Sequence, residues 1–182
     1  MKLLLVSLLL IFSMGANAAT KSLSAPVINW QMCSQAEVRA FVIFSVAHAQ
    51  LYRQYCPAGQ LPLTPPLMLV FRYSRDVPAD AFQRSSVHMI KKNLSAQAYA
   101  SLSTRIANFN RGYRNTQDGD VYRLEYRHDG RFLLYFNGQQ VASEKGDDFA
   151  HAYLSIWFGT EPYSNNLKQA LLTPAPKGAD DD

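Results

Sequence analysis

Arg39 is the first residue to consider for chemistry, because it lies in the otherwise apolar stretch VRAFVIFSV. A guanidinium group among apolar side chains needs an anionic partner, since an unpaired internal charge is costly. A ligand carboxylate bound through two parallel hydrogen bonds would supply that partner. A structural partner such as Glu37 or Asp120, or an exposed position, would equally account for the residue.

The neighbours of Arg39 indicate the kind of ligand that it could bind. Side chains two residues apart in an extended strand point to the same face, so Arg39 shares a face with Phe41, Ile43 and Ser45. Apolar side chains can bury the tail of an amphipathic molecule while charge-assisted hydrogen bonds bind its head group. We predict that these four residues bind such a ligand.

The remaining polar residues predict neither a catalytic group nor a metal site. The four histidines are scattered and lack the H-x-x-x-H and H-E-x-x-H spacings of zinc sites. His48 lies three residues after Ser45, so in one strand the two side chains would point to opposite faces. The chain also lacks the G-x-S-x-G motif of hydrolases. We therefore predict no catalytic residue, no metal and no cofactor.

The two cysteines, Cys33 and Cys56, lack the C-x-x-C spacing of redox sites. A pair of cysteines in an oxidising compartment is expected to form a disulfide, and two buried free thiols are the alternative. We interpret the predicted bond as structural, because a cross-link constrains the unfolded chain.

The first 18 residues have the pattern of a secretory signal peptide. Lys2 precedes a leucine-rich run, and Ala16-Asn17-Ala18 supplies the small residues of a cleavage site. The apolar run is too short to span a bilayer, and a membrane anchor is the alternative interpretation. We predict cleavage after Ala18, with Ala19 as the near alternative, and export to the periplasm of a protein that does not span the membrane.

Cleavage at that position leaves enough chain for one domain. We expect an N-terminal lead over residues 19–29, a folded domain over 30–172 and a disordered, proline-containing tail over 173–182. The formal net charge of +4 comes without a basic cluster, so the chain lacks the signature of a nucleic-acid-binding protein.

Alternating apolar residues predict strands in two parts of the chain. Residues 38–52 are apolar at both parities, which predicts one central strand covered on both faces. Residues 67–75 predict a strand with Leu69, Phe71 and Tyr73 on one face. Further along, the dipeptides Asp129-Gly130 and Asn137-Gly138 are hairpin signals, and they predict antiparallel strands before, between and after them.

Helical periodicity predicts two helices between these groups of strands and two after them. Asp76 and Ser95 are the predicted N-caps of the first pair. The pair Asp147-Asp148 is the predicted cap of a helix over residues 149–158, and a short helix follows over 164–172.

The predicted helix over residues 149–158 has one apolar stripe, formed by Phe149, Tyr153 and Trp157, which we assign to the core. The order strands, helices, strands, helices is typical of an α+β fold, with a mainly antiparallel sheet and helices packed on one face.

Several short motifs, in order, resemble those of the bacterial chalcone isomerase-like family, in its secreted branch. They are Gly119-Asp120, Asn137-Gly138, Asp148-Phe149, Ile156-Trp157-Phe158-Gly159, Pro162 and Leu171-Leu172. The resemblance implies an open-faced β-sandwich, in which a large antiparallel sheet is wrapped by a layer of helices.

The resemblance implies more than one function, because some members of this fold close a flavanone ring and others bind fatty acids. Ser45 follows Phe44, similar to a catalytic threonine that follows a phenylalanine in the plant enzymes. The active-site tyrosine and asparagine of those enzymes match no motif here.

We predict an exported, non-catalytic protein that binds a small apolar or amphipathic ligand such as a fatty acid. One alternative is an intramolecular lyase or isomerase in which Arg39 and Ser45 polarise the carbonyl of a chalcone-like enone. The other is an envelope interaction protein with a filled core and no pocket.

Overall fold

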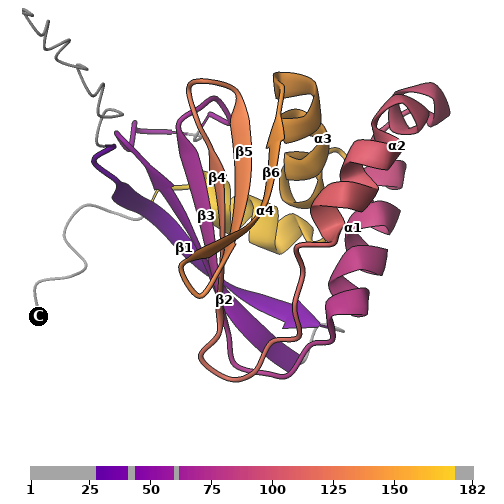
Figure 1. Ribbon diagram of the computed structural model, residues 1–182. Helices are drawn as coiled ribbons and strands as arrows, with labels where there is room; N and C mark the ends of the chain where they lie inside the picture. Colours follow the sequence, from indigo (N-terminus) through magenta and orange to yellow (C-terminus); the bar gives the residue numbers. More distant parts are fainter. Residues whose placement is uncertain (1–27, 41–43, 60–61, 175–182) are drawn as a thin grey trace, which may run out of the picture.

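The computed structural model describes residues 28–40, 44–59 and 62–174. In this part of the chain six antiparallel strands form one sheet, and each strand pairs with the next in the sequence (Figure 1). The strands are β1 (Gln31–Ala40), β2 (Phe44–Arg53), β3 (Leu67–Tyr73), β4 (Val121–Tyr126), β5 (Arg131–Phe136) and β6 (Gln139–Lys145). The predicted signal peptide, Phe41, Ile43 and the tail from residue 175 lie outside the described residues.

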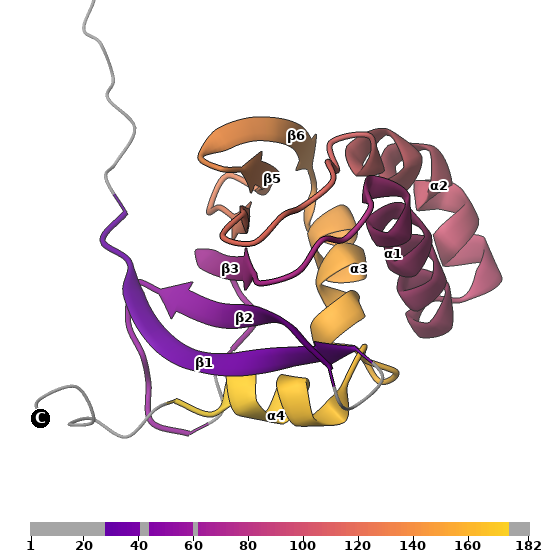
Figure 2. The ribbon, with the colours of Figure 1, turned by 90° about the horizontal axis from the view of Figure 1, so that it is seen from below.

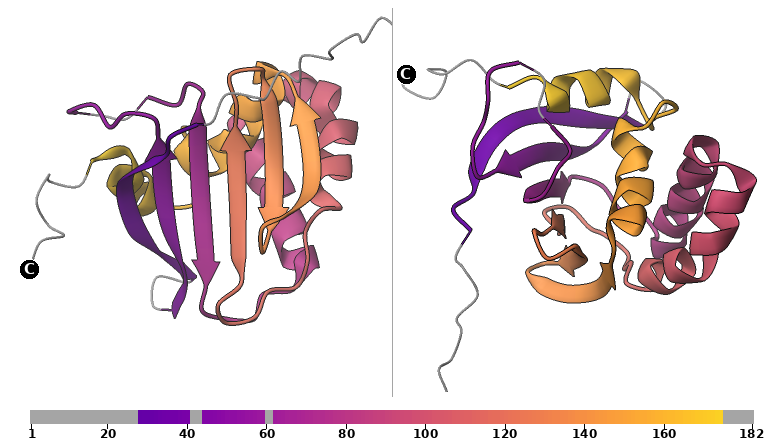
Figure 3. Two further views of the ribbon diagram at one scale, coloured as in Figure 1. Left: turned by 60° about the vertical axis from the view of Figure 1, so that its left-hand side comes forward. Right: turned by 90° about the horizontal axis from the view of Figure 1, so that it is seen from above.

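Four helices in the described residues pack on one face of this sheet, and the other face carries no helix (Figure 3, left). Between β3 and β4 come α1 (Ala79–Asn93) and α2 (Ala96–Asn110), and after β6 come α3 (Asp147–Phe158) and α4 (Asn165–Leu172). Helices α3 and α4 lie next to the sheet, α1 packs outside α3, and α2 packs against α1 and also contacts β6 (Figure 2). The α+β fold with a sheet wrapped by helices is therefore confirmed.

The predicted hairpin turns are confirmed. Gly130, Asn137 and Gly138 have φ angles of 74°, 49° and 83°, in the left-handed region that these turns require. Strand β5 pairs with β4 before it and β6 after it. The turns thus set the register of the second half of the sheet.

The prediction of one central strand over residues 38–52 was wrong. Strand β1 ends at Ala40 and β2 begins at Phe44, and the two pair as an antiparallel hairpin with β1 at the edge of the sheet. One face of β2 is buried, as at Ala49, and the other is open, as at His48. The intervening residues FVI contain none of the glycine, proline, asparagine or aspartate that marks a turn, so the pattern read as continuous.

Two of the three predicted helix caps differ from the structure. Ser95 caps α2 as predicted, because its hydroxyl accepts a hydrogen bond from the Ala98 amide. Helix α1 instead has Pro78 at its N-cap, and α3 has Gly146, so Asp76 and the Asp147-Asp148 pair are not caps. Proline restricts φ to helical values at no cost in hydrogen bonds at this end.

The carboxylates of Asp147 and Asp148 lie in the first turn of α3 and bind other elements. Asp147 accepts a hydrogen bond from the Tyr126 hydroxyl at 2.7 Å, and Asp148 accepts one from Arg105 at 2.9 Å. Negative charge near a helix N-terminus is favourable, and these contacts also join α3 to β4 and α2.

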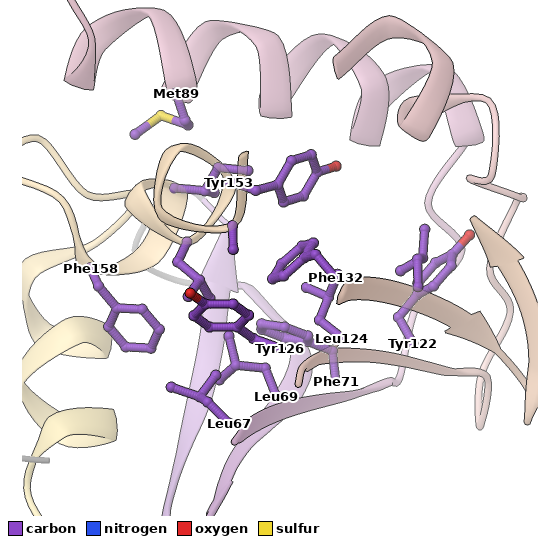
Figure 4. Packing of buried hydrophobic residues seen from close by; sticks show 14 of the residues in the cluster. Leu67, Leu69, Phe71, Met89, Tyr122, Leu124, Tyr126, Phe132, Tyr153 and Phe158 are labelled. Carbon is purple, nitrogen blue, oxygen red and sulfur yellow. The ribbon is translucent and has the colours of Figure 1, made fainter. Parts of the chain in front are cut away.

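The core lies between the sheet and the helices and is largely aromatic. Phe132 of the sheet packs against Tyr153 of α3 with ring centroids 5.5 Å apart, and Tyr126 packs beside Phe132 (Figure 4). Phe149 and Tyr153 are fully buried, so two of the three residues of the predicted stripe are confirmed as core. Trp157 is only partly buried and has a different position, described below.

Cys33 of β1 and Cys56, which follows β2, are joined by a disulfide. The bond closes a loop with a sequence separation of 23 residues.

Replacing both cysteines with alanine should lower the free energy of unfolding by about 3 kcal/mol, because the unfolded chain then regains the entropy that the loop had removed. Guanidinium chloride unfolding measures this difference, and the reduced wild-type protein is the matched control. Equal stability of the oxidised and reduced forms would contradict the prediction.

Candidate functional site

A cavity of about 240 Å³ lies between one end of the sheet and the helices α1 and α3. Its lining residues are Val38, Val46, Phe71, Tyr73, Val77, Ala81, Phe82, Ser85, Ser86, Tyr113, Ile156, Trp157 and Tyr163. The walls are therefore mostly aliphatic and aromatic, and the polar groups among these residues are hydroxyls and the indole N–H.

The sheet contributes the first wall through three neighbouring strands. Val38 of β1 lies opposite Ala47 of β2, and Ala47 lies opposite Tyr73 of β3. Because the alanine side chain is only a methyl group, it leaves space above the sheet between the larger side chains of Val38 and Tyr73. Phe71, two residues before Tyr73, continues the wall toward the middle of the sheet.

Helix α1 contributes Ala81, Phe82, Ser85 and Ser86, which recur at the i, i+4 spacing of one helix face. The ring of Phe82 lies between other aromatic side chains, with its centroid 5.3 Å from that of Tyr73. This packing fixes the first turns of α1 against the end of the sheet.

Helix α3 closes the cavity with its C-terminal half. Ile156 and Trp157 line the cavity, and the Trp157 ring packs against Phe71 with centroids 5.2 Å apart. Trp157, which we assigned to the core, packs against the core and also lines the cavity. The apolar stripe of α3 therefore fills the core with its first two residues and lines the cavity with Trp157, because the helix extends past the end of the filled core.

The cavity's hydroxyl groups differ in whether they already have partners. The Tyr113 and Tyr153 hydroxyls lie 2.9 Å apart, and Tyr153 donates to Asn110 Oδ1 at 2.7 Å. Tyr163 donates to the Arg39 carbonyl at 3.2 Å. The Tyr73 hydroxyl makes no hydrogen bond with the described part of the chain.

The cavity is electrically neutral at ordinary pH. Burial raises the pKa of Tyr73 well above the usual value for tyrosine, and burial also raises the pKa values of Tyr113 and Tyr163. These phenols therefore remain protonated. Among the described residues that line the cavity there is no carboxylate, imidazole, ammonium or guanidinium group.

Arg39 lies outside this cavity. Its side chain is 59% exposed and forms an ion pair with Glu37 at 2.6 Å. Hydrogen bonds from Ser45 and Arg39 lower the pKa of Glu37, so the structure brings Arg39 and Ser45 together around that carboxylate. Because β1 and β2 form a hairpin, Arg39 and Ser45 are cross-strand partners instead of residues along one strand. The predicted ligand contacts of Arg39 and Ser45 stay a prediction.

The sequence pattern did not indicate Val38, Val46 or Trp157 as cavity residues. It did place Tyr73 on the same strand face as Phe71, and both residues line the cavity. A tyrosine at the last position of a buried strand face was the available signal, because its hydroxyl can reach the end of the core.

Among residues 28–40, 44–59 and 62–174, no cluster of histidine, cysteine or acidic side chains could bind a metal ion. Within those same ranges, no helix has the length and hydropathy to cross a bilayer.

The family model described as chalcone isomerase-like matches residues 36–173. The chain belongs to the chalcone isomerase-like family. The matched range contains every residue that lines the cavity. Among solved structures of similar fold, a fatty-acid binding protein from Arabidopsis thaliana is 15% identical, with a TM-score of 0.49 over 80% of this chain and 85% of that chain. No curated protein matches this member of the chalcone isomerase-like family.

Proposed function

We propose that this protein is an exported, non-catalytic member of its family that binds a small apolar or amphipathic ligand in the cavity between the sheet, α1 and α3. The observation that carries the proposal is a cavity of about 240 Å³ whose walls are apolar apart from a few hydroxyls and an indole N–H. Ligand sites commonly combine such walls with a few polar groups. An apolar cavity of roughly 150 Å³ already binds benzene, so this one suits a ring or a chain of medium length.

The expected affinity for a simple ligand is modest. A ligand that loses as much apolar surface as a buried aromatic side chain, about 200 Å², gains roughly 5 kcal/mol. Lost translational and rotational freedom offsets part of that gain. We expect dissociation constants of about 0.2 mM or weaker for simple probes.

The position of the cavity bears on the two alternative functions. An isomerase that uses Arg39 and Ser45 would need both residues beside the substrate, and both lie outside the cavity lining. A protein with a filled core and no pocket does not fit a cavity of this size. Ligand binding is the function that the geometry supports best.

Export is part of the proposal and has separate support. The predicted signal peptide over residues 1–18 lies outside the described residues. The disulfide between Cys33 and Cys56 is typical of oxidising compartments such as the periplasm.

Replacing Ala81 with phenylalanine tests the cavity directly. Ala81 lines the cavity, and the added ring should fill much of its volume. We expect the variant to bind toluene and 1-octanol at least tenfold more weakly in isothermal titration calorimetry. Ala100→Phe is the matched control, because Ala100 is exposed on α2. Wild-type affinity in Ala81→Phe, or no binding of either probe to the wild type, contradicts the proposal.

Native mass spectrometry of the protein from a periplasmic extract supplies the complementary result. A discrete added mass on the wild type that Ala81→Phe lacks would show that a natural ligand uses this cavity. The same spectrum tests export, because cleavage after Ala18 gives the intact mass of residues 19–182.

A further inference from the structure

The polar groups around the cavity point to the chemical class of its ligand. From β3, the loop after α2 and the loop after α3 come the phenols of Tyr73, Tyr113 and Tyr163, and from α1 come the hydroxyls of Ser85 and Ser86. The described cavity residues of β1, β2 and α3 contribute no titratable group. Every titratable group that the described residues present to a bound ligand is therefore a neutral hydroxyl.

Three arginines that directly adjoin cavity residues in the sequence already have partners. Arg39 forms an ion pair with Glu37, and Arg72 donates to the Gly119 carbonyl. Arg114 donates to the carbonyls of Arg111 and Tyr113. A ligand carboxylate in the cavity would lose its hydration without gaining a cation, which is strongly unfavourable.

Tyr73 has the hydroxyl best placed to bind a ligand. Of the cavity's three tyrosines, Tyr113 and Tyr163 have hydrogen-bond partners within the described part of the chain, and Tyr73 has none there. Its ring is held edge-on against Phe82 and Tyr122, with centroids 5.3 Å and 6.0 Å away. The phenol is thus held in position by its neighbours while its O–H can donate to an oxygen atom in the cavity.

We infer that the cavity selects uncharged ligands that carry one carbonyl or hydroxyl group, bound by the Tyr73 hydroxyl, and rejects ionised carboxylates. This inference rests on the proposed function. It narrows that function, because a fatty acid would enter only as the protonated acid.

Selection against the ionised form has a quantitative consequence for pH dependence. If only the protonated acid binds, its apparent dissociation constant rises tenfold for each pH unit above the pKa of the acid. Burial raises the pKa of Tyr73, so that phenol remains a donor over the same pH range. An uncharged ligand of the same length should bind with constant affinity.

The experiment compares 1-octanol with octanoic acid between about pH 5 and 8, below the range in which tyrosine ionises. Trp157 fluorescence in the Trp30→Phe background reports binding, because Trp157 lines the cavity and the replacement removes the other tryptophan of the chain. We expect constant affinity for octanol, a tenfold loss per pH unit for the acid, and a preference for octanol of roughly a hundredfold at neutral pH.

Tyr73→Phe tests the role of the hydroxyl in the same assay. We expect octanol to bind roughly three- to tenfold more weakly and toluene, which accepts no such hydrogen bond, to bind as before. Tyr55→Phe is the control, because Tyr55 is 67% exposed and is not a cavity residue. If Tyr73→Phe fails to fold, the pH series on the Trp30→Phe protein still decides the question.

The outcomes separate the inference from the proposed function. Octanoate that binds as tightly as octanol at about pH 8, and is blocked by Ala81→Phe, overturns the inference and leaves ligand binding intact. Failure of toluene, octanol and octanoate to bind overturns both. Equal octanol affinity in wild type and Tyr73→Phe overturns the assignment of Tyr73.

Discussion

Replacing Phe149 with alanine should lower the free energy of unfolding by about 3–5 kcal/mol. Phe149 is fully buried in the first half of α3. Its ring centroid lies 5.2 Å from that of Phe109, 6.0 Å from Phe132 and 5.6 Å from Tyr153. It therefore packs against α2, the sheet and its own helix at once.

The loss has two parts, because the substitution removes buried apolar surface and also leaves a cavity that rigid aromatic neighbours cannot fill. The guanidinium group of Arg105, which lies 5.2 Å from the ring centroid, also loses its cation–π contact.

Chemical unfolding in urea measures this change in the free energy of unfolding. Phe44→Ala is the matched control, because Phe44 is 56% exposed and should change stability by no more than about 0.5 kcal/mol. A loss below about 1 kcal/mol at Phe149 would mean that the core is not packed as described.

The second large effect is a loss of stability in alkali, caused by buried tyrosines. Burial raises the pKa of Tyr122 to about 12. Burial, together with the hydrogen bond to Asp147, raises the pKa of Tyr126 to about 12. In the unfolded chain both phenols ionise near the usual tyrosine pKa of about 10.

The sign follows from the protons that each state binds. Below about pH 10 both phenols are protonated in both states, so their contribution to stability is fully present. Between about pH 10 and 12 the unfolded chain releases protons that the folded protein retains, so stability falls as the pH rises. A difference of two pKa units corresponds to about 2.7 kcal/mol per tyrosine, or about 5 kcal/mol for the two together.

Urea unfolding between about pH 8 and 12 tests this dependence. The Tyr122→Phe and Tyr126→Phe variants should each show a shallower slope than the wild type, since phenylalanine has no proton to release; the other buried tyrosines, whose pKa values burial also raises, keep the rest of the slope. Tyr55→Phe, which removes an exposed phenol, should keep the wild-type slope. A stability that is level up to about pH 12 would show that neither phenol is held neutral by the fold.

Much of the architecture follows from local sequence. The dipeptides Asp129-Gly130 and Asn137-Gly138 specify their hairpins because few residues adopt positive φ at low cost. Ser95 caps its helix because a short hydroxyl side chain can accept from the backbone. Hydrophobic periodicity placed the four helices, because burial of one face is a local property of a helix. The family was predicted separately, from the resemblance of several short motifs, in order, to those of the family.

Tertiary structure decided which side chains meet. The sequence offered Glu37 as a partner of Arg39, but the hairpin between β1 and β2 has no glycine, proline or aspartate in its sequence. Only strand pairing therefore revealed that Ser45 joins Arg39 at the Glu37 carboxylate. The bonds that join Tyr153 to Tyr113 and Asn110 span about 40 residues.

The cavity likewise depends on contributions from β1, β2, β3, α1, α3 and the loops between them. The residues that these segments contribute to the cavity lining are ordinary apolar or hydroxyl residues. A cavity is a property of the space between packed elements, so no single stretch of sequence encodes it, and it arises only when the elements pack with a small residue, Ala47, between larger ones.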